Sequence, residues 1–373
     1  MSSPFKYGKI VTGDHFINRS ADIQRIQNNI SAGINTILIS PRRWGKSSLI
    51  KQVEQLNTDH ELRFAFLDFF KIRTEEEFLT SYMREVIRCS ISRKEELLQT
   101  GKEFFRNLSP TFSFGADPVN DFTLKLTWNE ARRTKDEIIN LPEVIANKRG
   151  IKIVVCIDEF QNISKLPESV LFEQELRSYW QYHNNTTYCL YGSRKHMMME
   201  LFKEESRAFY RFGDLFLLQK IPEKHWIDYI RDSFSKTGKR ISKDIVHKMI
   251  SLTSNHPDYL QQLSHNTWNN TDSEVTEEIL SESMELVISS NTLYYQDICE
   301  GLSTTQINLL KAILHGERRL TSAATMLDFN LGTPRNVSKN KKMLVTKDIL
   351  EIHGDMIHFN DPIFEYWLKY FYL

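Results

Sequence analysis

The 373-residue sequence has no excess charge of either sign and no long apolar run. Its 48 Lys and Arg residues balance its 48 Asp and Glu residues, so the formal net charge is zero. A neutral chain lacks the global basic field that attracts nucleic acid, so any charged partner has to be met by a local patch. No apolar run approaches the ~20 residues that a bilayer-spanning helix needs. We therefore expect no membrane segment.

Cysteines are also scarce. The four that are present, Cys89, Cys156, Cys189 and Cys299, are widely spaced and form no C-x-x-C metal or redox motif. The first residues, MSSPFKYGKIVTGDHF, lack the apolar stretch of a signal peptide. We therefore expect a cytoplasmic protein with buried, reduced thiols. The chain length favours two or three domains over a single core.

The first two thirds of the chain alternate apolar, strand-like runs with helical stretches. The expected strands are residues 34–39, 62–67, 151–157, 186–191 and 215–218. Apolar strands separated by helices predict an α/β fold, with a parallel five-stranded sheet covered by helices on both faces. An insert at about residues 100–140 alternates apolar and polar positions around Gly115–Asp121, which predicts a β-hairpin.

Beyond Ile221 the strand-like runs give way to helical patterns. The segment 222–292 reads as helical throughout. In the segment 293–373 three expected helices precede two short strands around His353-Gly-Asp355, an order typical of a winged helix-turn-helix domain. Thr333 is the expected N-cap of the third helix and Pro334 its first residue. The predicted domains are therefore residues 1–221, 222–292 and 293–373.

The stretch SPRRWGKSS ends like a phosphate-binding loop, but Ser40 stands where G-x-x-x-x-G-K-[ST] has its first glycine. It lies between an apolar run and a helix, where loop amides and a helix N-terminus together hold phosphates. Lys46 is expected to reach the β- and γ-phosphates of ATP, and Ser47 to offer its hydroxyl to Mg²⁺. The expected nucleotide contacts are Ser40, Pro41, Arg42, Arg43, Trp44, Gly45, Lys46, Ser47 and Ser48.

An acidic pair follows the strongest apolar run, in KIVVCIDEFQ. Asp158 is expected to hold the Mg²⁺ shell. Glu159 is expected to orient and deprotonate a water aimed at the γ-phosphate. The alternative is that the pair only caps a buried strand. Because the loop and the acidic pair occur together in the right order, the sequence predicts a site for ATP and ADP.

Three further positions each have two interpretations. Ser193 follows the fourth expected strand and either senses the γ-phosphate or belongs to a plain turn. Arg211 either reaches a γ-phosphate, in its own chain or in a neighbouring subunit, or is a solvated surface residue. His256, with Pro257, either touches the nucleotide or caps a turn.

These residues together resemble the archaeal-type ATPases of the STAND class of P-loop NTPases, which are AAA-like and carry a winged-helix C-terminus. The resemblance rests on FINRSADIQRIQNNISAGINTILISPRRWGKSSLI, VVCIDEFQNI, the strand-end Gly192-Ser193, FYRF, SNHPDYLQQL and NDPIFEYWLKYF. It implies an extra strand between the two Walker strands, Glu159 as the water-activating residue, and a helical lid over the base. It also implies that ATP acts as a switch that reorients the appended domains.

The sequence departs from this family's pattern in two places. Ser40 replaces the first loop glycine. Asn255 replaces the glycine usual before His-Pro, and Asn tolerates the left-handed backbone conformation.

The stretch GTPRNVSKNKKMLVTK holds five basic residues and no acid. On a recognition helix, Arg335, Lys339, Lys341 and Lys342 would meet DNA phosphates. The alternative is a module for packing, self-association or a protein partner, with solvated charges. We expect a slow Mg²⁺-dependent ATPase that works as a switch. The competing hypothesis is a DNA-binding or protein-adaptor module whose nucleotide site is structural and does not turn over.

Overall fold

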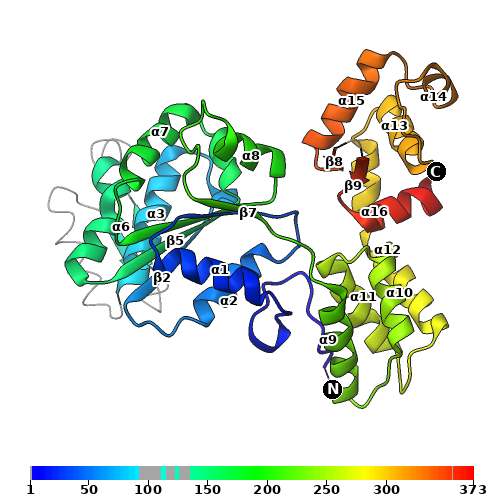
Figure 1. The fold of residues 1–373 in the computed structure, drawn as a ribbon, viewed down its shortest axis with the longest axis horizontal. Helices are drawn as coiled ribbons and strands as arrows, with labels where there is room; N and C mark the ends of the chain where they lie inside the picture. The colour runs from blue at the N-terminus through cyan, green and yellow to red at the C-terminus, as the bar shows by residue number, and fades with distance from the viewer. Residues whose placement is uncertain (1, 92–110, 115–121, 126–134, 355) are drawn as a thin grey trace. The chain divides into compact units, whose positions relative to one another are not determined.

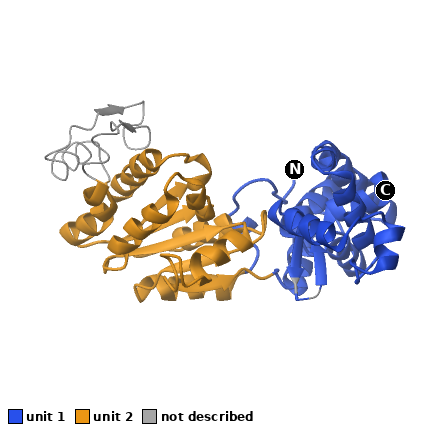
Figure 2. Ribbon diagram, turned by 90° about the horizontal axis from the view of Figure 1, so that it is seen from above, with its two compact units in different colours: residues 1–18, 220–373 blue, residues 19–219 orange. Residues whose placement is uncertain are grey.

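The computed structural model describes residues 2–91, 111–114, 122–125, 135–354 and 356–373. The chain divides into two compact units, Arg19–Gln219 and Met1–Asn18 with Lys220–Leu373 (Figure 2). This grouping differs from the three expected domains, because the amino-terminal residues join the carboxyl-terminal part and the last two domains count as one unit. The boundaries at residues 221 and 292 stay predictions.

The unit Arg19–Gln219 is built on a five-stranded parallel sheet (Figure 1). Its strands lie in the order β2-β5-β6-β1-β7. Their bounds are β1 Thr36–Ile39, β2 Leu62–Asp68, β5 Lys152–Asp158, β6 Thr186–Gly192 and β7 Asp214–Leu217. Because β6 lies between β5 and β1, the expected extra strand between the two Walker strands is confirmed, as is the α/β fold class.

Helices cover both faces of this sheet, which explains why its strands are apolar on both sides. The helices α1 (Ser20–Ser31) and α2 (Lys46–Gln55) lie on one face (Figure 1). The opposite face carries α3 (Glu75–Ser90), α6 (Lys135–Arg149) and α7 (Ser169–Trp180), and the chain continues through α8 (Lys195–Lys203). Alternate residues of β5, namely Ile153, Val155 and Ile157, belong to the buried core of that face.

Capping residues set the start of several helices. The side chain of Thr74 accepts a hydrogen bond from the Glu77 backbone N–H at the start of α3, and three acidic residues occupy its first turn. Both features stabilise a helix N-terminus. Helix α2 differs, since its N-cap residue is Gly45, which has no side chain and adopts the left-handed conformation. A helix N-terminus that follows a glycine in this way is the arrangement in which backbone N–H groups hold phosphates.

The insert contains two short strands, β3 (Thr111–Phe114) and β4 (Phe122–Lys125). They pair antiparallel, with Thr111 opposite Lys125 and Phe114 opposite Phe122. This pairing confirms the expected hairpin strands. The connecting residues 115–121, and the rest of the expected insert before residue 135, lie outside the described residues.

The second unit is helical and ends in a winged helix. Its first helices are α9 (Glu223–Lys236), α10 (Lys243–Leu252), α11 (Pro257–Asn270) and α12 (Glu277–Glu300). They are followed by α13 (Thr304–Leu314), α14 (Ala323–Asp328), α15 (Pro334–Thr346), β8 (Leu350–His353), β9 (Met356–Phe359) and α16 (Pro362–Trp367). The winged helix is confirmed, as are Thr333 as the cap of α15 and Pro334 as its first residue. Helix α12 runs across the expected boundary at residue 292.

A half-buried carboxylate joins the two parts of this unit. Asp361 caps α16 by accepting the Ile363 and Phe364 backbone N–H groups. It also accepts hydrogen bonds from the hydroxyls of Tyr259 in α11, at 2.5 Å, and Tyr295 in α12, at 3.2 Å. Burial raises the pKa of Asp361, and the hydrogen bonds that it accepts oppose that effect. The helical part and the winged helix therefore share one core.

No helix within the described part of the chain is both long and apolar enough to span a bilayer.

Candidate nucleotide-binding site

The expected phosphate loop connects the carboxyl end of β1 to α2. Gly45 has a φ of 89°, a left-handed conformation that favours glycine, and Lys46 and Ser47 begin the helix. Ser40 is 1% exposed, and its N–H donates to the carbonyl of Gly192 on β6 at 3.2 Å. The first loop position therefore accommodates a small buried residue other than glycine.

The middle of the loop carries the bulky residues that distinguish it from a Gly-rich loop. The side chains of Arg42 and Arg43 are exposed, whereas Trp44 is half-buried. Arg43 adopts a φ of 61°. The Trp44 carbonyl accepts a hydrogen bond from the buried guanidinium of Arg19 at 3.0 Å. Arg19 thus holds the loop backbone at Trp44, while the side chains of Arg42 and Arg43 face solvent.

Lys46 and the acidic pair meet at the carboxyl edge of the sheet. The Lys46 Nζ atom lies 2.7 Å from Glu159 Oε1 and 3.7 Å from Asp158 Oδ1. The Ser47 hydroxyl donates to Asp158 Oδ2 at 2.6 Å. The phosphate loop and the acidic pair, more than a hundred residues apart in the chain, therefore form one cluster.

The second oxygen of Glu159 has two other partners. Its Oε2 atom accepts hydrogen bonds from Ser193 Oγ at 2.8 Å and from Gln161 Nε2 at 2.5 Å. Ser193 thus lies beside the acidic pair, and the γ-phosphate-sensing role expected for it stays a prediction. The sequence motifs did not indicate a role for Gln161. Its only signal there is its position two residues after Glu159 in IDEFQ.

The two carboxylates differ in their electrostatics. Burial raises the pKa of Asp158, and the opposing effects of Lys46 and Ser47 do not cancel it. Burial also raises the pKa of Glu159, but the charge of Lys46 and the hydrogen bonds to the carboxylate outweigh burial. The pKa of Glu159 is therefore held below its usual value. This keeps Glu159 ionised, as a residue that accepts a proton has to be.

The donor set suits Mg²⁺. The described residues contain no cluster of three or more His, Cys, Asp or Glu side chains. However, Mg²⁺ in nucleotide sites takes only one or two protein oxygens and completes its shell with phosphates and water. The Ser47 hydroxyl and the Asp158 carboxylate, already 2.6 Å apart, offer those two oxygens. The residues present therefore fit the ion.

Arg211 lies away from this cluster. It precedes β7, whose first residue, Asp214, pairs with Thr36, the first residue of β1. The phosphate loop follows the last residue of β1, so the two are separated by the length of that strand, roughly 10 Å. This placement argues against contact with a γ-phosphate of the same chain. The form of the prediction that we retain is contact with the nucleotide of a neighbouring subunit.

His256 and Pro257 belong to the other unit. Pro257 is the first residue of α11 and His256 is its N-cap residue, with its ring centroid 4.7 Å from that of Tyr259. Asn255 has a φ of 57°, the left-handed conformation that it was expected to tolerate. The turn is therefore well defined, and a contact between His256 or Pro257 and the nucleotide stays a prediction.

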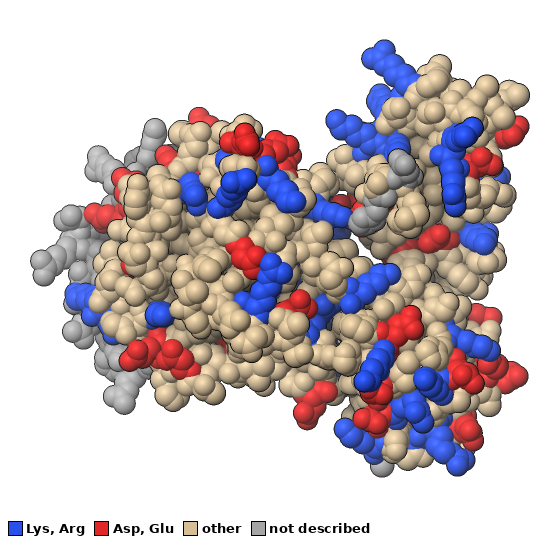
Figure 3. Space-filling view, in the orientation of Figure 1, with Lys and Arg blue, Asp and Glu red and all other residues tan. Residues whose placement is uncertain are grey.

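The basic residues of the winged helix lie on α15. Arg335, Lys339 and Lys342 are exposed, whereas Lys341 is partly buried. The spacing of the exposed three, four and then three residues apart, puts them along one side of the helix. Figure 3 shows Lys and Arg side chains projecting from this part of the molecule. The helix thus presents a basic face to solvent.

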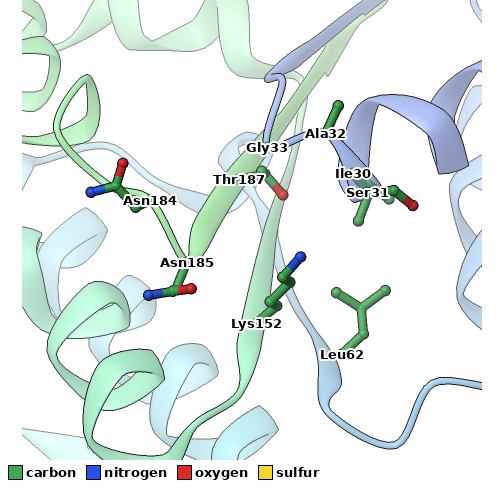
Figure 4. Close-up of a pocket in the computed structure, with 9 residues that line it drawn as sticks. All are labelled: Ile30, Ser31, Ala32, Gly33, Leu62, Lys152, Asn184, Asn185 and Thr187. Atoms are coloured by element: carbon green, nitrogen blue, oxygen red, sulfur yellow. The ribbon is translucent and has the colours of Figure 1, made fainter.

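A separate hollow of about 240 Å³ lies at the amino edge of the sheet (Figure 4). It is lined by the end of α1 and by residues at the starts of three strands, among them Leu62, Lys152, Asn185 and Thr187. The amino group of Lys152 points into it (Figure 4). None of the expected site residues lines this hollow, and it lies at the edge opposite the phosphate loop.

The parallel sheet, the inserted strand β6 and the loop between β1 and α2 define a P-loop ATPase fold. The family model "ATPase domain predominantly from Archaea" matches residues 16–263, and "Probable winged helix domain" matches residues 293–370. The chain therefore belongs to this archaeal-type ATPase family and carries a winged helix after the ATPase domain. A comparison with curated protein sequences finds no match.

Solved structures share this fold. The Walker-type ATPase PABY2304 of Pyrococcus abyssi aligns with 98% of this chain and 99% of its own, at 15% identity and a TM-score of 0.68. The ORC2 protein of Aeropyrum pernix, in ADPNP–ADP complexes, aligns with 98% of this chain and 96% of its own, at 13% identity and a TM-score of 0.54. At these identities the similarity shows the fold alone.

Proposed function

We propose that this protein is a cytoplasmic, Mg²⁺-dependent ATP hydrolase of the STAND class whose nucleotide state acts as a conformational switch. One observation carries the proposal. Lys46 and Ser47, at the start of α2, contact Glu159 and Asp158 at the end of β5. A phosphate-binding cation, a metal-ligand pair and a general base thus meet beside a helix N-terminus that follows Gly45.

Each residue has a separate role in this proposal. The loop amides and Lys46 bind the phosphates, and Ser47 and Asp158 hold the metal. A Mg²⁺ ion held by these two residues would supply positive charge against the phosphates. Glu159 takes a proton from the attacking water, whose oxygen bonds to the γ-phosphorus as the bridging bond to ADP breaks. Glu159 is ionised and close enough to the loop for this step.

The switch would begin at the Lys46–Glu159 ion pair. In the structure these two side chains neutralise each other. Phosphates compete for Lys46, so ATP binding frees one oxygen of Glu159. We propose that Ser193 reports the γ-phosphate and that His256 and Pro257 carry the nucleotide state to the helical lid. Arg211 would act on the nucleotide of a neighbouring subunit.

Two measurements test this function. The first is the melting curve with and without Mg·ATP. A ligand that binds only the folded state adds about 2.7 kcal/mol at a hundredfold excess over its dissociation constant. The second is steady-state phosphate release with Mg·ATP, which we expect to continue beyond one turnover per chain. No melting shift at millimolar ATP would sink the proposal.

A second candidate function is DNA binding through α15. The observation that favours it is the exposed row of Arg335, Lys339 and Lys342 on a helix without an acidic residue. Such a row neutralises phosphates, so affinity would fall steeply with salt. Phosphate release is to be compared with and without duplex DNA. A burst of no more than one phosphate per chain would favour a DNA-binding or protein-adaptor module with a structural nucleotide.

A further inference from the structure

The carboxamide of Gln161 is buried against the carboxylate of Glu159. Gln161 is only 1% exposed, and its Nε2 atom lies 2.5 Å from Glu159 Oε2. This contact fixes the orientation of the amide, because an amide oxygen at that distance would repel the carboxylate. Ser193 Oγ donates to the same oxygen at 2.8 Å. Two donors from different strand ends therefore hold Oε2, while Oε1 faces Lys46.

The backbone around Glu159 is shaped for this contact. Glu159 has φ 52° and ψ 39°, a left-handed conformation that is costly for a residue with a side chain. Its N–H donates to Asp158 Oδ1 at 2.8 Å, which stabilises the turn. The turn leads into a 3₁₀ helix, Phe160–Lys165, and brings Gln161 back beneath the carboxylate. The left-handed backbone of Glu159 thus lets the side chains of Glu159 and Gln161 face each other.

Gly192 leaves the space that Gln161 occupies. A Cβ atom at Gly192 would lie 1.9 Å from Gln161 Oε1 and 2.8 Å from the sulfur of Met198. Real side chains do not approach so closely, so any other residue here would displace the amide. The carboxyl end of β6 therefore contributes twice, with Gly192 making room for Gln161 and Ser193 supplying the second donor.

The oxygen of the Gln161 amide indicates that Gln161 does more than fill space in the core. Gln161 Oε1 is buried and has no hydrogen-bond partner among the residues that the structure describes. A buried acceptor without a partner destabilises the fold, and an apolar side chain of similar size would avoid that cost. What Gln161 adds over an apolar residue is the Nε2 donor on Glu159.

We propose that Gln161 is a positioning residue for Glu159. Together with Ser193 it holds Oε2, so that Oε1 alone is presented to water once Lys46 moves to the phosphates. Without these donors the carboxylate turns freely about its last torsion, which is a broad and roughly two-fold one. The alignment of Oε1 with the attacking water is then lost. This inference rests on the proposed hydrolase function.

The kinetic test uses Gln161→Met, which keeps the side-chain length and removes the donor, and Ser193→Ala. We expect the kcat for Mg·ATP hydrolysis to fall about tenfold or more in each, since catalysis is sensitive to small misplacements. In Gln161→Met the KM for ATP and the Kd of a fluorescent ADP should change less than about twofold. Gln52→Met is the matched control, because Gln52 is also buried in this unit, on α2, and is no part of the proposed machinery.

A second readout needs no activity. In the nucleotide-free protein, Gln161→Met should lower the melting temperature less in a Glu159→Ala background than in the wild type, because the contact is already gone there. Coupled residues behave in this non-additive way. Fully additive losses would show that the contact does not exist and would overturn the inference.

The outcomes separate the inference from the function on which it rests. If the wild type neither binds Mg·ATP nor releases phosphate, the hydrolase proposal is wrong. If the wild type hydrolyses ATP and Glu159→Ala abolishes this, yet Gln161→Met keeps the wild-type kcat, only the positioning role is wrong. A rise in KM and Kd as large as the loss in kcat would show a merely structural role and would also overturn it.

Discussion

Arg19 donates a hydrogen bond from Nη2 to the carbonyl oxygen of Trp44, at 3.0 Å. Its Nη1 atom donates to the carbonyl of Gln219 at 2.9 Å and lies 3.3 Å from the carboxylate of Asp22. Trp44 directly precedes Gly45 and Lys46. One buried guanidinium therefore ties the functional half of the phosphate loop to the first and last residues of its unit.

The first prediction concerns this anchor. We expect Arg19→Met to weaken Mg·ATP binding about tenfold, because hydrogen bonds made by a charged group are among the stronger ones and the loop carbonyl loses its partner. Calorimetric titration measures the effect. Arg25→Met is the control, since Arg25 lies on α1, the helix that Arg19 precedes, is half exposed and pairs with Asp214. Equal affinities in the two variants would contradict the role of the anchor.

The second prediction concerns Lys46. Lys46→Ala should reduce ATP affinity at least about a hundredfold, because a charge-assisted contact to phosphate is lost and two carboxylates are left to repel the ligand. Equilibrium binding of a fluorescent ATP analogue checks this. Lys51→Ala, on the same helix but with its amino group over the Phe66 ring, should bind as the wild type does.

The third prediction separates binding from hydrolysis. Glu159→Gln should lower kcat about a hundredfold or more, the contribution expected of a general base. It should also bind ATP more tightly than the wild type, because Lys46 no longer has an ionised partner at 2.7 Å. Phosphate release and Kd are the measurements. Glu168→Gln, an exposed acid-to-amide change, is the control. Turnover at the wild-type rate would refute the assignment of Glu159.

The fourth prediction concerns pH. Burial lowers the pKa of His183 to about 4, although Glu143 acts in the opposite direction. The ring is 2.9 Å from Asn140 Oδ1 and 2.8 Å from the Tyr188 hydroxyl. An unfolded histidine titrates near 6.5, so between about 4 and 6.5 the unfolded state binds more protons. Stability should therefore rise with pH across this window and fall as the solution is acidified.

The measurement is the unfolding free energy as a function of pH. His183→Gln removes the titrating group, so the slope between about pH 4 and 6.5 should be shallower than in the wild type. The exposed His60 provides the control, His60→Gln. If both variants showed the wild-type slope, the neutral, buried state of His183 would be excluded.

The elements could be predicted from the sequence because their signals are local. The apolar run 151–157 is β5 almost to the residue, and Thr333 and Pro334 begin α15 as expected. The position of Arg211, in contrast, could not be predicted from local sequence signals. In a parallel sheet, the residue before one strand and the residue after the neighbouring strand lie at opposite edges. Placing Arg211 therefore required both the order of the strands and their direction.

The contact between Gln161 and Glu159 could not be predicted in this way. It depends on one left-handed residue and on the missing side chain of Gly192, a residue of a different strand. Neither the periodicity of the sequence nor the spacing of its motifs contains that information. The position of the amino-terminal residues could not be predicted either. An apolar residue is expected to be buried, but the sequence does not indicate which of the two cores it joins.

The position of Phe5 affects the order in which the two units fold during synthesis. Phe5 lies in the core of the carboxyl-terminal unit, with its ring centroid 5.9 Å from Tyr229 and 5.5 Å from Phe234. Residues 19–219, a continuous stretch with its own core, are synthesised between these partners. Because domains fold as units as they leave the ribosome, the ATPase core can be complete while Phe5 still lacks its neighbours. The core of the second unit is complete only when Phe5 has met α9, which is made after residues 19–219.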